Sequence, residues 1–256
     1  NNMKLKSKLL LAALATSSAA FAQTAPAAAE SAIAYNVGVV SEYRYRGIGQ
    51  TKGDPALQGG VDYTDASGFY AGAWASTIKW IKDADLNGAA PAKGSVELDL
   101  YGGYKFEAAG IGYDVGFLRY EYVGNTYDKV GANANTNEVY GAATYGVTTL
   151  KYSHALSNLF GNIDSKGSTY WDLSATFDLG NGYSLVPHAG RQKVSGYPQY
   201  SYTDVALTLN KDLGDGLALS LSAISTNGKE SNFKPLSNTG YNSAKNTTVV
   251  GLKYSF

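Results

Sequence analysis

The chain has 256 residues, with 21 basic and 21 acidic side chains, 21 tyrosines, 30 glycines and no cysteine. The lack of cysteine excludes disulfides and thiolate chemistry, and the balanced charge leaves no basic footprint for nucleic acid. After Leu14 no apolar run approaches the roughly 20 residues that a membrane-spanning helix needs. The composition instead favours a β protein with one polar face and one apolar face.

The N-terminal 22 residues have the pattern of a secretory signal peptide. Three lysines precede a short apolar run at 9–14, and small residues lead to an A-x-A site at 20–22. We predict cleavage before Gln23, because the run is too short for a retained anchor. Removal of the three lysines leaves 18 basic against 21 acidic side chains. Residues 23–33 are predicted to form a flexible lead-in, followed by a barrel over 34–256.

From residue 34 onward, apolar and polar residues alternate with period two. Glu97 and Asp99, for example, alternate with Val96, Leu98 and Leu100, which is typical of a strand with one apolar face. Most of the repeating segments have about the ten residues that a tilted strand needs to cross a bilayer. The twelve predicted strands are 34–46, 56–64, 68–79, 95–107, 111–122, 137–145, 147–155, 168–179, 183–193, 202–212, 217–226 and 246–256.

The connections between these strands alternate strictly between tight turns and longer segments. Transmembrane β-barrels show this alternation, with short periplasmic turns and long extracellular loops. A soluble up-and-down barrel has no reason to separate its loop lengths in this way. The predicted fold is therefore all-β, a transmembrane antiparallel up-and-down β-barrel with twelve strands. Its expected partners are outer-membrane lipid, small solutes or ions, and the barrel-insertion machinery, since the last strand ends on Phe256 in a pattern that resembles that machinery's recognition signal.

Four segments carry a family resemblance: SEYRYRGIGQT at 41–51, PALQGGVDY at 55–63, SGFYAGAWAS at 67–76 and the closing GLKYSF at 251–256. Together they resemble the TorF-type family of predicted porins, which are proteobacterial outer-membrane proteins. The resemblance implies a porin-like barrel in the outer membrane of a Gram-negative bacterium. It implies no catalytic residues and no particular solute.

Charged side chains on the polar face are predicted to line the lumen, because a lipid-facing Arg or Lys costs roughly 2–4 kcal/mol at the bilayer midplane. Charged rings set ion selectivity in open channels, whereas cross-strand ion pairs would fill a narrow lumen instead. A twelve-stranded barrel lies between these cases in size. Acids outnumber bases, which weakly favours cations. The predicted pore-lining residues are Glu42, Arg44, Arg46, Asp62, Glu97, Asp99, Lys105, Asp114, Asp172 and Lys253, with Glu138, Lys151 and Asp204 also on the inward face.

The tyrosines are predicted to divide between the two faces of the wall. Period two places Tyr43 and Tyr45 outward, in an aromatic girdle at the membrane interface, and Arg44 and Arg46 inward. These arginines either line an open pore or are paired with neighbouring carboxylates. Inward tyrosines offer faces for carbohydrate stacking as an alternative role; they include Tyr101, Tyr140 and Tyr170.

A weaker motif is the sequence DADLNG in a long loop. Asp83, Asp85 and Asn87 match the first half of a calcium-binding loop. The twelfth position is Gly94, where a bidentate Glu is needed. A solvated turn is therefore favoured, and no metal or other cofactor is predicted.

A histidine-dependent hydrolase is the weakest functional alternative. Such chemistry needs a base oriented beside a serine or a water molecule. The only histidines are His154 and His188, and Ser153 points to the opposite face from His154. The predicted function is a porin-like channel for passive diffusion of small hydrophilic solutes or ions, not an enzyme. The main alternative is a non-conducting barrel whose external loops bind a ligand or partner.

Overall fold

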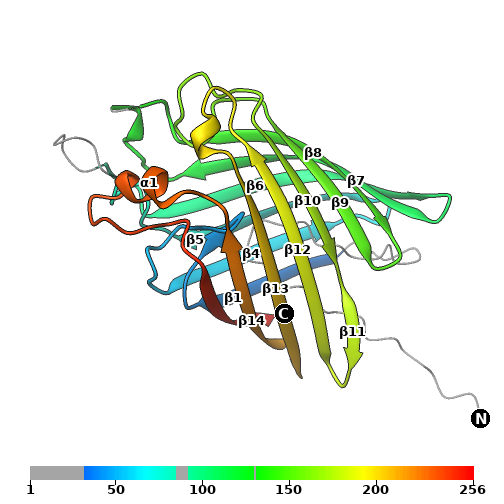
Figure 1. Cartoon of the computed structure of the whole chain (residues 1–256). Coiled ribbons are helices and arrows are strands. Elements are labelled where there is room, and N and C mark those ends of the chain that lie inside the picture. The colour runs from blue at the N-terminus through cyan, green and yellow to red at the C-terminus, as the bar shows by residue number, and fades with distance from the viewer. Residues whose placement is uncertain (1–31, 85–91, 130) are drawn as a thin grey trace, which may run out of the picture.

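The wall of the protein is one antiparallel sheet that closes into a barrel (Figure 1). The computed structural model describes residues 32–84, 92–129 and 131–256. The sheet has thirteen strands, but β10 and β11 are two segments of one wall strand. The closed barrel therefore has twelve wall strands. The strands of the wall are β1 (Ala32–Val40), β4 (Ala56–Thr64), β5 (Phe69–Thr77), β6 (Val96–Ala108), β7 (Ile111–Tyr122), β8 (Thr136–Tyr145), β9 (Thr148–Ala155), β10 (Thr169–Ala175), β11 (Phe177–Gly180), β12 (Tyr183–Lys193), β13 (Tyr202–Gly214), β14 (Leu217–Thr226) and β15 (Thr247–Ser255).

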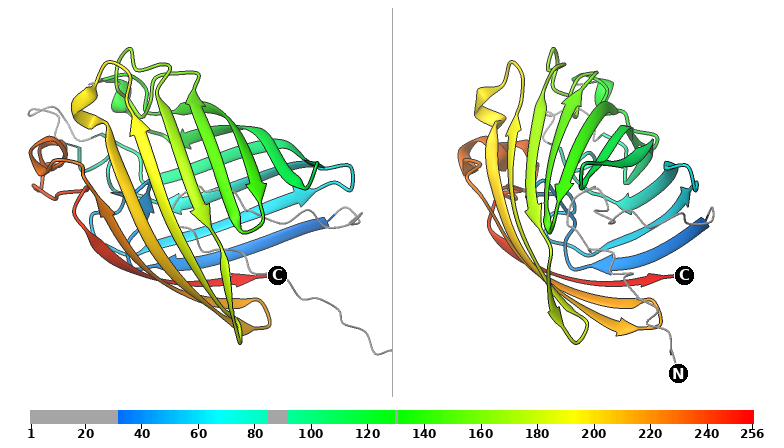
Figure 2. Two further views of the ribbon diagram at one scale, coloured as in Figure 1. Left: turned by 45° about the vertical axis from the view of Figure 1, so that its right-hand side comes forward. Right: turned by 90° about the vertical axis from the view of Figure 1, so that its right-hand side faces the viewer.

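The barrel is closed because every wall strand pairs with a neighbouring strand on both sides. β1 pairs with β4 and with β15, and β10 pairs with β9 and with β12. In Figure 2 the first and last strands, blue and red, run side by side. The predicted strand boundaries agree with the observed ones within about two residues, except at β1. This strand starts at Ala32 and ends at Val40, six residues before its predicted end.

Short turns lie at one end of the barrel and long loops at the other, as predicted. The short turns use left-handed backbone conformations: Asn181 and Gly182 have φ of 51° and 75°, as a two-residue type I′ turn requires. We call this end the turn end and the opposite end the loop end. Loops 1 to 6 are residues 41–55, 78–95, 123–135, 156–168, 194–201 and 227–246. They contain β2 (Arg44–Tyr45), β3 (Ile48–Gly49), η1 (Tyr127–Lys129), η2 (Pro198–Tyr200), α1 (Glu230–Phe233) and η3 (Lys234–Leu236).

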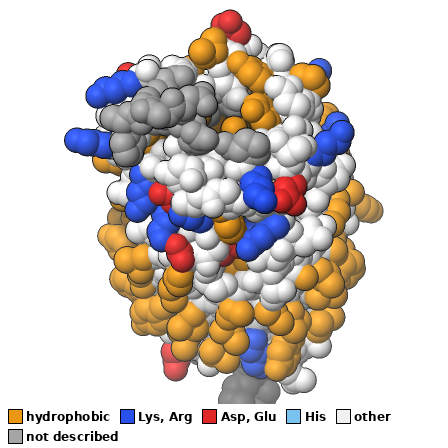
Figure 3. Space-filling model, turned by 60° about the vertical axis from the view of Figure 1, so that its left-hand side comes forward, with side chains coloured by type: hydrophobic (Ala, Val, Ile, Leu, Met, Phe, Trp, Pro, Cys, Tyr) orange, Lys and Arg blue, Asp and Glu red, His pale blue; other side chains and the backbone are white. Residues whose placement is uncertain are grey.

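The outer face of the wall is apolar. Val37, Leu57, Leu207 and Leu221 are all more than 40 % exposed, and Figure 3 shows apolar side chains covering the wall while charged ones gather toward the loops. A band of this kind suits hydrocarbon better than water. In the described part of the chain, no helix is both long and apolar enough to span a membrane.

Aromatic rings form a girdle at the turn end of the outer face. Tyr35 stacks on Phe256 with ring centroids 5.7 Å apart, and Phe106 stacks on Tyr113 at 5.0 Å. Tyr104 contacts Phe106 at 5.9 Å and so extends the row. These tyrosines lie outward near the strand ends, as predicted; that they form a girdle at the interface between hydrocarbon and water stays a prediction.

Candidate functional site: the lumen

The chain leaves the wall after β1 and folds into the lumen, where a continuous strand to residue 46 was predicted. Ser41 still bonds to β15, since its Oγ accepts from the Val250 N–H at 3.0 Å. Beyond it, β2 and β3 form a small hairpin, with Tyr45 paired to Ile48. Arg46 and Gly47 make its two-residue turn, with φ of 47° and 79°. The prediction was wrong because the arms of a hairpin alternate with the same period as a continuing strand.

Tyr43 and Tyr45 therefore lie inside the barrel and do not belong to the outer girdle. Their exposed fractions are only 2 % and 7 %. The Tyr43 ring packs edge-on against Trp74 with centroids 5.4 Å apart, and its hydroxyl donates to Glu97 Oε1 at 2.7 Å. The Tyr45 hydroxyl bonds the Tyr120 hydroxyl at 2.7 Å. Burial, reinforced by the nearby Glu97 carboxylate, raises the pKa of Tyr43 well above its usual value.

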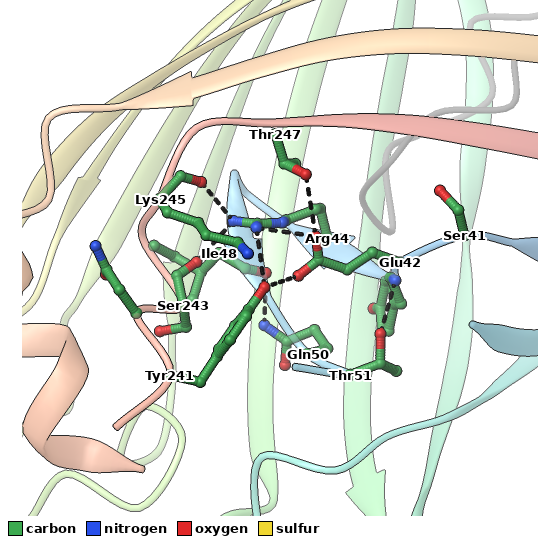
Figure 4. A network of polar contacts seen from close by, with 12 residues as sticks. Ser41, Glu42, Arg44, Ile48, Gln50, Thr51, Tyr241, Ser243, Lys245 and Thr247 are labelled. Atoms are coloured by element: carbon green, nitrogen blue, oxygen red, sulfur yellow. Dashed lines mark hydrogen bonds and ion pairs between the residues drawn. The ribbon is translucent and has the colours of Figure 1, made fainter. Parts of the chain in front are cut away.

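Arg44 is fully buried in a polar network between loop 1 and loop 6 (Figure 4). One terminal nitrogen donates to the carbonyl oxygens of Gly47 at 3.1 Å, Ser243 at 2.7 Å and Lys245 at 3.0 Å. The other donates to Glu42 Oε2 at 2.9 Å. Tyr241 also donates to Glu42 and thereby completes its pairing. The guanidinium thus ties the hairpin to the last loop.

Arg46 crosses the lumen to the opposite wall. Its two terminal nitrogens bind the two carboxylate oxygens of Glu138 at 3.0 and 2.7 Å, and one also donates to Gln192 Oε1 at 3.0 Å. The guanidinium lies 4.3 Å from the ring centre of Tyr170, which adds a cation–π contact. Burial alone lowers the pKa of Arg46, but Glu138 outweighs it and holds that pKa well above the usual value. Both arginines of loop 1 are therefore paired with carboxylates.

We call residues 41–55 the plug, because they fill the lumen near the loop end. Backbone bonds anchor the plug on two sides: Gly49 donates to the Ser243 carbonyl at 2.8 Å, and Lys79 donates to the Gln50 carbonyl at 2.9 Å. Its aromatic rings join an apolar cluster that includes Ile78, Ile81 and Tyr120. Burial of each such side chain is worth about 1.5–3 kcal/mol. The plug is thus an integral part of the barrel's packing.

The inner face of the lower lumen, toward the turn end, carries side chains that are less buried than those around the plug. Here tyrosine rings lie along the wall over glycines of neighbouring strands: a Cβ on Gly116 would meet the Tyr140 ring at 2.5 Å, and one on Gly103 the Tyr70 hydroxyl at 2.5 Å. Tyr70 donates to Asp114 Oδ1 at 2.6 Å. Small residues beneath these rings keep the side chains from crossing the lumen.

All ten predicted pore-lining residues lie in the plug or on the inner face, but in two groups. Glu42, Arg44, Arg46, Glu97, Asp99 and Asp172 lie toward the loop end, and each is less than a tenth exposed. Asp62, Lys105, Asp114 and Lys253 lie toward the turn end; Lys253 is buried and the other three are half-buried. For the residues on wall strands, the period-two alternation agrees with the observed inner face; that these residues line a pore stays a prediction. The alternation carried no signal for Phe160 of loop 4, which lies outside the strands and packs against the plug's aromatic cluster.

The histidine and calcium alternatives gain no support. His188 Nε2 contacts Asp172 Oδ2 at 2.9 Å and the Tyr170 hydroxyl at 3.3 Å, and its Nδ1 lies 3.5 Å from Asp204. These contacts include no serine hydroxyl. Asp83 pairs with Lys52 at 3.4 Å, whereas Asp85 and Asn87 lie outside the described residues. Within the described ranges, no group of three or more His, Cys, Asp or Glu side chains could hold a metal ion.

The barrel is similar in fold to outer-membrane porins. It matches a KdgM porin in complex with disordered oligogalacturonate at a TM-score of 0.54 and 9 % identity, over 88 % of this chain and 99 % of that one. The match to a NanC porin has a TM-score of 0.53 and 9 % identity, with the same coverage. An outer membrane channel from Pseudomonas putida F1 matches at 0.51 and 13 % identity, over 91 % of this chain and 99 % of that one. These likenesses establish the fold.

Sequence comparison identifies a family without assigning an activity. No curated protein matches the chain. A family model described as "Bacterial protein of unknown function (Gcw_chp)" matches residues 24–256, which include the whole barrel. The chain belongs to the Gcw_chp family.

Proposed function

We propose that the protein is an outer-membrane channel for passive diffusion of small hydrophilic solutes or ions, closed at its loop end by the plug in the state described. The observation that carries the proposal is a closed twelve-stranded barrel with polar side chains inside and an apolar band outside. The porin names of the structurally similar barrels support it, as does the resemblance to the TorF-type family. The proposal includes no enzymatic step and no cofactor.

The proposal also covers the location of the protein. We infer a Gram-negative outer membrane, reached after removal of residues 1–22 as a signal peptide. The mass of the purified protein tests this, since cleavage before Gln23 removes a defined segment. Phe256 is 65 % exposed on the outer face, where it is available to the barrel-insertion machinery. Replacement of this terminal residue by a polar one is expected to lower the yield of inserted barrel.

A non-conducting barrel is a second candidate, favoured by one observation. The plug buries two paired arginines and the Tyr43 and Tyr45 side chains at the loop end. A plug held this firmly suits a barrel whose external loops bind a ligand or partner. In that case conduction plays no part.

Planar bilayers distinguish the two candidates. Purified protein, shown to be folded and inserted, is expected to give discrete conductance steps, either spontaneously or after the plug is displaced. Silence of both the wild type and a variant without the plug would rule out the channel and leave the loop-binding barrel. The reversal potential in a salt gradient then gives the sign of the permeating ion.

A further inference from the structure

One buried carboxylate in the lumen lacks a partner. Asp99 is the fourth residue of β6 from the loop end, and its exposed fraction is 1 %. Within the described part of the chain, neither carboxylate oxygen has a hydrogen-bond partner. A charged group that is buried without compensation is costly. The site therefore calls for a proton or a bound cation.

The surroundings of Asp99 are aromatic and acidic. In the strand register it lies directly opposite Trp74 on one side and Tyr120 on the other. The Tyr43 ring of the plug packs edge-on against Trp74. Glu97, two residues along the same face of β6, is also buried, and it accepts from the Tyr43 hydroxyl.

Among the residues that the structure describes, this pair of carboxylates has no salt-bridge partner. Arg46 is the basic group that acts on Asp99 electrostatically, alongside the acids Glu97 and Glu138. Its terminal nitrogens are already used by Glu138 and Gln192. Among the described residues, no Lys, Arg or His forms an ion pair with Glu97 or Asp99. The ion pairs of the plug's two arginines therefore leave Glu97 and Asp99 without a cationic partner within the described ranges.

The position of Asp99 suits a ligand that enters from the turn end. Asp99 itself is sealed beneath the plug, whereas Tyr101, the next inward residue of β6, is half-buried and bonds Asp62 at 2.5 Å. Asp99 thus lies at the boundary between the more buried and the less buried parts of the inner face.

We propose that Asp99 and Glu97 form a binding site for one small singly charged cation, of the alkali or ammonium kind, beneath the plug. The carboxylates supply the charge, and Trp74 and Tyr120, which lie opposite Asp99 in the strand register, are aromatic residues of the kind that attract cations. The ligand set is too small for the six to eight oxygens that calcium takes. A role of the site in cation permeation rests on the proposed channel function. Cation binding at the site does not depend on that function.

Thermal unfolding of the full chain in detergent micelles tests binding without conduction. The apparent midpoint is measured in potassium chloride and in N-methylglucamine chloride at equal ionic strength, so that general screening is the same. A ligand that binds only the folded state raises the midpoint. At ten times the Kd, the wild type is expected to unfold roughly 3 °C higher in potassium. Ammonium chloride is expected to act like potassium.

Two variants assign the shift to the site. Asp99→Asn keeps the side-chain volume and is expected to abolish the difference between the two salts. Asp114→Asn is the matched control, because Asp114 is a lumen carboxylate that already has a partner in Tyr70; it is expected to keep the difference. Glu97→Gln serves as the second site variant, with a reduced difference, and it provides the same test if Asp99→Asn does not fold.

The outcomes separate this inference from the proposed function. Equal midpoints of the wild type in both salts, or an equal salt difference in all variants, would overturn the cation site and leave Asp99 as a protonated structural group. A potassium shift that is lost in Asp99→Asn, reduced in Glu97→Gln and kept in Asp114→Asn supports the site even if bilayers stay silent. Conductance without that shift supports the channel and rejects the site.

Discussion

The two halves of the lumen are built from the same strands but differ in what fills them. Toward the loop end, the plug places Tyr43, Tyr45 and Arg46 across the lumen, and charged groups there are buried and mostly paired. Toward the turn end, rings such as Tyr70 and Tyr140 lie along the wall over glycines, and several charged groups stay half-buried. The comparison teaches that strand number alone does not decide whether a barrel is open, because one inward-folded loop can close half of it.

Replacement of the plug hairpin tests the comparison most directly. A flexible Gly-Ser linker in place of residues 43–50 removes the groups that cross the lumen, so a several-fold rise in bilayer conductance is expected. The same replacement in loop 5 is the control, since its residues Val194 and Tyr197 pack against Leu159 of loop 4 and not against the plug. Unchanged conductance in the hairpin variant would show that the lower lumen is sealed as well.

The pairing of Arg46 with Glu138 gives the largest expected effect on stability. Arg46→Ala leaves Glu138 buried without a cation, which costs about 3–5 kcal/mol. The change is measured as the free energy of unfolding in urea, with protease cleavage of loop 1 as a local readout. Arg191→Ala is the control, because Arg191 is exposed and contacts Thr203 at 3.2 Å; it is expected to stay within about 0.5 kcal/mol.

A double variant sharpens this test. Adding Glu138→Gln to Arg46→Ala removes the unpaired charge, so part of the lost stability is expected to return. If the double variant is as unstable as the sum of the two single variants, the pair contributes no coupling energy, and the other contacts of the plug hold it in place.

The rings along the wall of the lower lumen predict a smaller effect. Gly116→Ala places a Cβ 2.5 Å from the Tyr140 ring and is expected to cost about 1–3 kcal/mol of unfolding free energy. Gly141→Ala is the matched control, since no atom lies within 4 Å of its Cβ position. Equal stability of the two variants would mean that neither the Tyr140 ring nor the Gly102 carbonyl oxygen, which lies 2.8 Å from the same Cβ position, resists the added methyl group.

The hydroxyl of Tyr43 predicts the smallest effect. Tyr43→Phe removes the 2.7 Å bond to buried Glu97, and the expected loss is about 1 kcal/mol. In the exposed reference Tyr63→Phe, the hydroxyl lies 3.3 Å from Asp65, and almost no change is expected. If both variants lose the same stability in urea, burial in the plug adds nothing to this hydrogen bond.

The wall of the barrel could be predicted from the sequence because two different surroundings act on it. An apolar surrounding outside and polar groups inside require apolar and polar residues to alternate along each strand. Neighbours such as Leu98 and Asp99 show this alternation. Turn residues such as Asn181 and Gly182 then mark the reversals. Strand number, strand limits and the alternation of turns and loops follow from these local signals.

The interior of the lumen could not be predicted in the same way. The partners of Arg46 are 92 and 146 residues away, at Glu138 and Gln192. These distances along the chain carry no local pattern, because such contacts depend on how the closed barrel places its strands. The inward fold of the plug was missed for a second reason. Its alternation of Tyr43, Arg44 and Tyr45 matches a strand, and only Gly47 and Gly49 suggest a reversal.

The bonds of Arg44 to loop 6 constrain the order in which the protein assembles. Its acceptors, the carbonyls of Ser243 and Lys245, are 199 and 201 residues away along the chain. They reach the plug only when β15 pairs with β1, which is the contact that closes the ring. The guanidinium of Arg44 therefore gains these loop 6 acceptors only after the last strand is in place. We expect the plug to become fixed late in assembly, and a barrel that stalls before closure to keep a loosely held plug.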